Sequence, residues 1–235
     1  MKEVKSPNYN DRTSSTVKYL IFHYTGMATG AAALERLCDP EASVSAHYLI
    51  EEDGTVFNLV DEEKRAWHAG VSKWENDTDI NDLSIGIEIV NPGHSYPGYE
   101  GGYRAFPKIQ MDSVKKLSLD IIRRHAIKPF YVLGHSDVAW RRKIDPGELF
   151  DWRDLAKEGI GCWPEKAPSD NGKAVSSRDF IKNLKIFGYD TDGCEQNISE
   201  ITAAFQRHFR QSNIDGELDY ETFYLLENLL KQKIS

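Results

Sequence analysis

The stretch Val-Lys-Tyr-Leu-Ile-Phe-His-Tyr-Thr, residues 17–25, decides the fold that this sequence predicts. Residues 17–24 are apolar on both faces, which is typical of a central strand covered on both sides. Two further runs, at residues 84–90 (Ser-Ile-Gly-Ile-Glu-Ile-Val) and 130–133 (Phe-Tyr-Val-Leu), are also predicted strands. Each of the three strands carries or precedes a residue that can bind a metal or transfer a proton, so together they predict a sheet and a site.

Strands and helices alternate from residue 17 to about residue 165. Residues 31–38 and 112–125 are predicted helices, the second with Asp112 as its N-cap. The Asp-Gly pair at residues 53–54 predicts a hairpin between two further strands. Residues 91–107 are rich in Gly, Pro and Tyr, so we expect a surface loop near the site. This alternation predicts an α/β fold.

The composition changes at residues 166–176, which resemble a linker. Beyond them the apolar period is helical and predicts three helices. The second of these begins at Asn197, where Glu200 would complete a capping box. We therefore expect residues 1–165 to form one domain and residues 177–235 to form a small three-helix module with its own core.

Composition and charge restrict the classes of function. Hydrophobic residues make up 40% of the chain and charged residues 28%, as in a soluble globular protein. The formal net charge of -8 weighs against nucleic acid or an anionic membrane as the main partner. The three cysteines form no CxxC, so neither a zinc knuckle nor a redox motif is indicated. No apolar run approaches the length of a transmembrane helix, and the N-terminus lacks the apolar core of a secretory leader.

Two histidines and an aspartate are candidate metal ligands. His23 lies at the C-terminal end of the first strand, and His135 follows the third. Asp145 lies ten residues after His135, where it would complete a two-histidine, one-carboxylate zinc set with a fourth position open for water. The alternatives are a hydrogen-bonded core histidine at position 23 and a plain turn at Asp145-Pro146-Gly147.

Glu88 and Lys143 are candidate catalytic residues. In residues 84–90 the isoleucines form one face, whereas Glu88 points to the other. A glutamate in such a strand is costly unless it is paired or working, so a buried salt bridge and a base of raised pKa are both open. Lys143 would point the same way as Asp145 if that segment is extended; the alternative is a solvated surface lysine.

An aromatic segment supplies candidates for substrate contact. Trp67 and His68 belong to the motif Ala-Trp-His-Ala-Gly, and Trp74 follows shortly after. We expect these three side chains to line a cleft, whereas we expect His47 to be structural.

Taken in order, these motifs resemble the type 2 N-acetylmuramoyl-L-alanine amidases over roughly residues 15–165. The resemblance is carried by Phe-His-Tyr-Thr (22–25), Ser-Ala-His-Tyr (45–48), the Asp-Gly hairpin (53–54), Ala-Trp-His-Ala-Gly (66–70), Ser-Ile-Gly-Ile-Glu (84–88), Gly-His-Ser-Asp (134–137) and Lys-Ile-Asp-Pro-Gly (143–147). It implies a mixed central sheet flanked by helices, with zinc held by His23, His135 and Asp145. It also implies that Glu88 is the catalytic acid/base and that Lys143 steadies the developing oxyanion.

Two substitutions relative to related families favour this assignment. Peptidoglycan-recognition proteins and phage amidases usually have Cys as the third ligand and Tyr as a catalytic residue. Here Asp145 and Ala46 stand at those places. The resemblance thus implies the branch that works with Glu88 and Lys143.

The activity implied is zinc-dependent hydrolysis of the amide between N-acetylmuramic acid and the L-Ala of the peptidoglycan stem peptide, in cell-wall turnover or recycling. One alternative is a non-catalytic peptidoglycan-recognition protein of the same fold, although the complete ligand set argues against it. Another is a zinc peptidase, for which the His-Glu-x-x-His pair is missing.

Residues 177–233 resemble the three-helix peptidoglycan-binding domain that often accompanies such amidases. The alternative is a helical module that serves only stability or dimerisation. If the module binds the wall, deletion of residues 170–235 should spare activity on small muropeptides and weaken binding to intact sacculi. A wall-binding module fits the periplasm or cell envelope, reached after removal of a leader or by another signal, whereas the N-terminus as it stands fits the cytoplasm.

Overall fold

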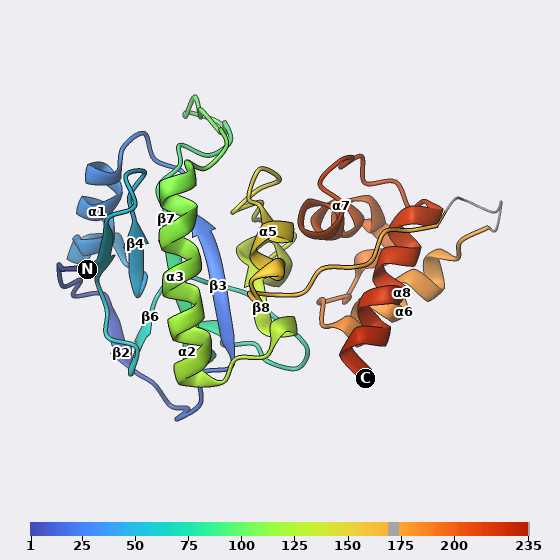
Figure 1. Cartoon of the computed structure of the whole chain (residues 1–235), viewed down its shortest axis with the longest axis horizontal. Coiled ribbons are helices and arrows are strands. Elements are labelled where there is room, and N and C mark those ends of the chain that lie inside the picture. Colours follow the sequence, from blue (N-terminus) through green and yellow to red (C-terminus); the bar gives the residue numbers. More distant parts are fainter. Residues whose placement is uncertain (169–173, 235) are drawn as a thin grey trace.

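A mixed six-stranded sheet forms the centre of the computed structural model, which describes residues 1–168 and 174–234 (Figure 1). The strands are β1 (Lys2–Glu3), β2 (Tyr9–Asp11), β3 (Tyr19–Tyr24), β4 (Tyr48–Ile50), β5 (Val56–Asn58), β6 (Lys64–Ala66), β7 (Ser84–Ile89) and β8 (Val132–Gly134). In the sheet their order is β1-β5-β4-β7-β3-β8, and only β4 and β5 pair antiparallel. Strands β2 and β6 form a separate two-stranded ribbon. The predicted mixed α/β fold is confirmed.

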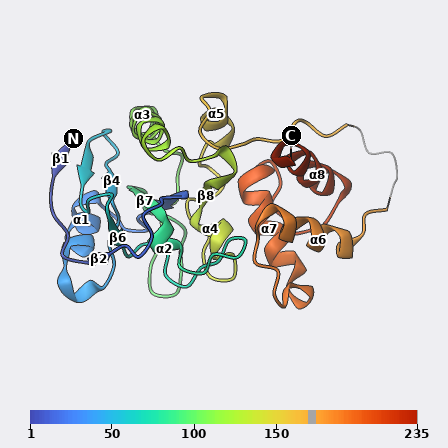
Figure 2. The ribbon, with the colours of Figure 1, turned by 90° about the horizontal axis from the view of Figure 1, so that it is seen from below.

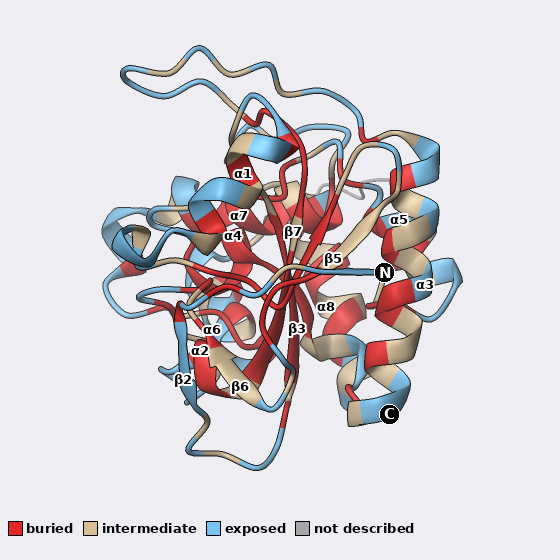
Figure 3. Ribbon diagram, turned by 90° about the vertical axis from the view of Figure 1, so that its left-hand side faces the viewer, coloured by how far each residue is buried: buried red, intermediate tan, exposed pale blue. Residues whose placement is uncertain are grey.

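Helices cover both faces of this sheet. They are α1 (Gly30–Cys38), α2 (Ile80–Leu83), α3 (Lys108–His125), α4 (His135–Val138) and α5 (Trp152–Lys157), with short 3-10 helices η1 (Pro40–Ala42) and η2 (Pro129–Tyr131). Seen from below, α3 and α5 lie on one side of the sheet and α1, α2 and α4 on the other (Figure 2). Strands β3 and β7 are therefore buried along nearly their whole length (Figure 3).

The register of β3 against β7 decides which side chains meet. His23 pairs with Glu88, and Tyr19 pairs with Ser84, four residues earlier on each strand. Side chains of directly paired residues in a parallel ladder point to the same face. His23 and Glu88 are therefore neighbours on one face, while the isoleucines of β7 pack against α3 on the other.

Helix α3 begins one turn earlier than predicted. Its N-cap is Pro107, which makes no side-chain capping hydrogen bond, so the prediction of Asp112 as N-cap is wrong. Gln110, in the first turn, donates from Nε2 to the carbonyl oxygens of Ile50 (3.1 Å) and Val90 (2.9 Å). These tertiary contacts anchor the first turn on the sheet, and they leave no trace in the local sequence.

The C-terminal helices share one core with the sheet. They are α6 (Ser177–Phe187), η3 (Cys194–Gln196), α7 (Ile198–Phe209) and α8 (Tyr220–Ile234), and they pack beside β8 and α4 (Figure 1). A single buried cluster joins Ile21, Trp74 and Leu133 to Phe187 and Phe205. The prediction of a module with its own core is therefore wrong. The predicted linker lies partly outside the described residues, which resume at residue 174.

Helix starts in this region follow the sequence only in part. Asn197 precedes α7, but its side chain makes no capping hydrogen bond, so the predicted capping box with Glu200 does not form. Asp219 precedes α8 and its Oδ1 accepts from the Thr222 backbone N–H at 2.8 Å. Across the described residues, no helix combines the length and apolar character needed to cross a bilayer.

Candidate metal centre

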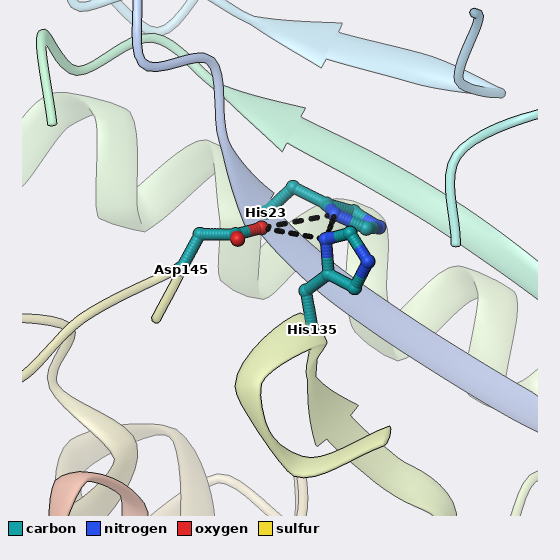
Figure 4. Close-up of side chains that lie close together, drawn as sticks. All are labelled: His23, His135 and Asp145. Carbon is teal, nitrogen blue, oxygen red and sulfur yellow. Dashed lines mark hydrogen bonds and ion pairs between the residues drawn. The ribbon is translucent and has the colours of Figure 1, made fainter. Parts of the chain in front are cut away.

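Three side chains converge beside the carboxyl ends of β3 and β8 (Figure 4). His23 belongs to β3, His135 opens α4 directly after β8, and Asp145 lies in the loop between α4 and α5. The two Nδ1 atoms lie 3.0 Å apart, and Asp145 Oδ2 lies 3.1 Å from that of His23 and 3.0 Å from that of His135. The structure thus brings the three predicted ligands together.

This donor set fits a zinc ion. All three side chains are buried, and one ligand atom from each lies within 4.8 Å of the others. Two imidazole nitrogens and one carboxylate oxygen are ligands that zinc takes in hydrolytic sites. The outer nitrogens turn away from the cluster: that of His23 meets His68 Nδ1 at 2.9 Å, and that of His135 meets the Ala69 carbonyl oxygen at 3.0 Å.

Burial and charge set the protonation states of the ligands. Burial, and then the neighbouring His135, lower the pKa of His23 to about 4, so this imidazole is neutral at neutral pH. For Asp145 burial acts to raise the pKa, but His135 and His23 overcome it and hold the pKa well below its usual range. A neutral imidazole and an ionised carboxylate are the forms that bind metal.

Glu88 lies on β7 beside His23 and is half-buried. Burial, and then the charge of Asp145, raise the pKa of Glu88 well above its usual value, while Lys143 acts to lower it. Its Oε2 has no hydrogen-bond partner, and no salt bridge to Glu88 forms within residues 1–168 and 174–234. The buried salt bridge weighed as an alternative is therefore absent from the part of the chain that the structure describes.

Lys143 is half-buried in the loop that carries Asp145. Its positive charge acts to lower the pKa values of both His23 and Glu88, as expected for an ammonium group close to both. Among the described residues it has no carboxylate partner. A lysine so placed is available to a negative charge that develops beside the cluster.

The three residues predicted to line a cleft have different positions. Trp74 is fully buried, with its ring centroid 4.8 Å from that of Tyr189, so the prediction that it contacts substrate is wrong. His68 is buried behind His23 rather than beside an open cleft. Trp67 is half-buried at the β2–β6 ribbon and donates to Asn10 Oδ1 at 2.7 Å; its contact with substrate stays a prediction.

The predicted surface loop, residues 91–107, lies against the segment that follows Asp145. Its His94 ring stacks on Tyr103, with centroids 4.0 Å apart, and His94 Nε2 lies 3.1 Å from Glu148 Oε1. Tyr103 donates from its hydroxyl to the Pro146 carbonyl oxygen at 3.0 Å. The expectation of a loop near the site is confirmed.

Asp137 has a role that the sequence did not reveal. It is fully buried two residues after His135, and its Oδ2 accepts from the Gly134 backbone N–H and lies beside His208 Nδ1, both at 2.7 Å. Tyr189 donates its hydroxyl to Oδ1 at 2.7 Å. The motif Gly-His-Ser-Asp places Asp137 near the site, but no local signal indicates its two partners from the C-terminal helices.

The cluster and its neighbours Glu88 and Lys143 have the make-up of a hydrolytic metal centre on a mixed sheet. A family model described as N-acetylmuramoyl-L-alanine amidase matches residues 13–148. The chain belongs to this family. It is accordingly an amidase, and the non-catalytic alternative is not favoured.

Relatives of known structure extend the match over the whole chain. The amidase AmiD of Escherichia coli K12 is 37% identical over 232 residues, which cover 92% of this chain and 83% of that protein. An AmiD structure in complex with anhydro-N-acetylmuramic acid-L-Ala-D-gamma-Glu-L-Lys superposes with a TM-score of 0.81, at 35% identity, covering 95% of this chain and 93% of the other. AmpDh3 of Pseudomonas aeruginosa gives a TM-score of 0.84 at 33% identity, covering 100% of both chains.

Proposed function

We propose that this amidase is zinc-dependent and hydrolyses the amide between N-acetylmuramic acid and the L-Ala of peptidoglycan stem peptides. The observation that carries the proposal is the convergence of His23 Nδ1, His135 Nδ1 and Asp145 Oδ2. Structures of AmiD and AmpDh3 are described as complexes with anhydromuramic peptides. They support muropeptides, with ordinary or 1,6-anhydro sugar, as the substrate class of this chain.

In the proposed reaction, His23, His135 and Asp145 hold the metal. A zinc ion held there supplies Lewis acidity, which polarises a carbonyl and lowers the pKa of a water molecule to about 7. Glu88 accepts a proton from the water as its oxygen attacks the lactyl carbonyl carbon. It then gives a proton to the nitrogen of L-Ala as the C–N bond breaks, so that the stem peptide leaves as an amine.

The positions of Glu88 and Lys143 suit these two tasks. The raised pKa of Glu88 brings the carboxyl group closer to neutral pH, where one group can both accept and release a proton. The ammonium group of Lys143 stabilises the negative charge that develops on the carbonyl oxygen. A donor of this kind is typically worth roughly 3–4 kcal/mol of barrier.

Mass spectrometry of muropeptide digests tests the proposal. Anhydro- and reduced muropeptides are incubated with the enzyme, with zinc or with a chelator. We expect zinc-dependent release of an intact stem peptide that begins at L-Ala, and the relative rates give the sugar preference. Cleavage within the stem would instead identify a peptidase. No release from either substrate, with zinc bound, would favour a recognition protein.

We further propose that helices α6–α8 hold the enzyme on polymeric peptidoglycan in the periplasm or cell envelope. Support comes from the resemblance of residues 177–233 to peptidoglycan-binding domains. The test is co-sedimentation of the full-length Glu88→Ala variant with sacculi, with soluble muropeptide in excess as competitor. Binding through the helices resists the competitor; binding through the catalytic site alone is abolished by it and contradicts the proposal.

A further inference from the structure

A buried chain of hydrogen bonds runs behind the ligand His23. His23 Nε2 lies 2.9 Å from Nδ1 of His68, and His68 Nε2 lies 3.1 Å from the hydroxyl oxygen of Ser84. The Ser84 hydroxyl lies 2.6 Å from the carbonyl oxygen of Ile80. The His68 and Ser84 side chains are both buried, so water does not replace these contacts.

Only one arrangement of protons satisfies this chain. A carbonyl oxygen cannot donate, so the single hydroxyl proton of Ser84 is committed to Ile80. Ser84 Oγ can then only accept from His68, which places the proton of neutral His68 on Nε2. His68 Nδ1 is therefore an acceptor, and the proton that it receives is the one on His23 Nε2.

We infer that His68 and Ser84 are positioning residues that hold His23 in the Nε2–H tautomer, so that its Nδ1 lone pair faces the metal. The inference deepens the proposed function and rests on it, because it concerns zinc at the same three ligands. The other histidine ligand needs no such relay: His135 Nε2 lies 3.0 Å from the Ala69 carbonyl oxygen, which can only accept.

Gly86 provides a second, independent observation. It lies in the middle of β7, and its backbone is not in the left-handed region, so conformation alone does not require glycine. A Cβ atom at this position would lie 2.4–2.6 Å from three atoms of the His68 ring. The strand therefore leaves at Gly86 the space in which His68 sits behind His23.

The test compares zinc affinity among full-length variants, measured by competition with a chromophoric chelator. We expect His68→Leu to weaken zinc binding by about 10- to 100-fold. His68→Gln should recover most of the loss, because its amide oxygen can accept from His23 while its NH₂ group donates to Ser84. Gly86→Ala, which displaces the ring without removing a polar group, should also weaken binding.

A matched pair of serine variants separates the relay from general packing. Ser84→Ala removes the acceptor that fixes His68, and we expect weaker zinc binding. Ser118 on α3 is also fully buried, but its hydroxyl has no hydrogen-bond partner among the described residues. Ser118→Ala should therefore leave zinc affinity unchanged.

Imidazole ¹⁵N NMR of the zinc-free wild-type chain gives the direct readout. We expect His23 to be protonated at Nε2 and unprotonated at Nδ1. A proton on His23 Nδ1, or a His68→Leu variant that binds zinc as tightly as the wild type, would overturn the inference and leave the proposed function intact. A wild-type chain that binds no zinc would instead overturn the proposed function.

Discussion

At the scale of single residues, the protonation of Glu88 depends on two neighbours of opposite charge. Asp145 raises its pKa and Lys143 lowers it, in addition to the larger effect of burial. Each neighbour also has a second task, as a metal ligand or as a cation for the oxyanion. Substitutions here should therefore change the pH dependence of the reaction as well as its rate.

Lys143→Met should move the acidic limb of the kcat/KM profile to higher pH. Lys143 lowers the Glu88 pKa in the wild type, so its loss raises that pKa further, and a general base works only when deprotonated. The rate at the optimum should fall about 10²- to 10³-fold as an oxyanion donor is lost. The measurement is a pH–rate profile on soluble muropeptide, with Lys108→Met, an exposed lysine on α3, as control. A limb that stays in place or moves to lower pH would contradict the expected coupling.

Glu88→Gln should keep zinc and lose turnover. The amide has nearly the same shape but cannot take a proton, and general acid–base catalysis typically contributes about 10²- to 10⁴-fold. Metal content is measured by atomic absorption and kcat by release of stem peptide. A variant that turns over at a rate close to the wild type would remove Glu88 from the mechanism.

At the scale of elements, the residues predicted well are those whose signal is local. Strand alternation placed Glu88 on the polar face of β7, and apolar runs placed His23 and His135 at strand ends. The register of β3 on β7 could not be predicted, because it depends on pairing between distant segments. Trp74 was assigned to a cleft because its core partners, including Tyr189, lie more than a hundred residues away in the chain.

Glu62 links the end of α3 to the sheet and should make stability depend on pH. Burial acts to raise its pKa, but hydrogen bonds from Arg124, Tyr48 and His125 lower it from 4.5 to about 2. The folded state therefore favours the ionised form. Its contribution is fully present above about pH 4.5 and is lost as the pH falls toward 2, with a magnitude of roughly 3 kcal/mol.

The corresponding variant is Glu62→Gln. We expect it to lower the free energy of unfolding at neutral pH and to flatten its decline in acid. Glu52→Gln is the control, because Glu52 pairs with Arg104 at the exposed surface, where an ion pair contributes about 0–1 kcal/mol. Urea titrations at several pH values measure both. Parallel curves for the wild type and Glu62→Gln would show that Glu62 does not supply the dependence.

At the scale of the whole molecule, the C-terminal helices complete the catalytic domain. Trp74, Leu133 and Trp140 are buried in the cluster that includes Phe187 of α6. Removal of residues 170–235 would expose this apolar surface to water, at a cost of about 25 cal/mol per Å². This shared core reverses the expectation, drawn from the sequence, that such a deletion spares activity on small muropeptides.

We expect the deletion to yield an insoluble protein or one with a strongly lowered Tm and little activity. Solubility, circular dichroism and turnover of small muropeptides measure the outcome. A soluble fragment with the activity of the full chain would show that the catalytic domain is independent after all.

A milder change tests the same contact. Tyr189→Phe removes the hydroxyl that donates to buried Asp137 and should cost about 1–3 kcal/mol, since the partner carboxylate stays buried. Tyr96→Phe, at an exposed ring, is the control. Thermal unfolding gives the comparison. Equal Tm values for the two variants would mean that Tyr189 does not help to hold the helices in place.

The pairing of His23 with Glu88 in the ladder has a consequence for how such enzymes diversify. Neighbouring strands are held about 4.8 Å apart by backbone hydrogen bonds, so the separation between this ligand and the base is a property of the sheet. Residues 91–107 contribute neither a ligand nor the base, yet they border the segment after Asp145. Evolution or design can therefore rewrite this loop to suit another sugar or peptide while the reacting groups keep their spacing.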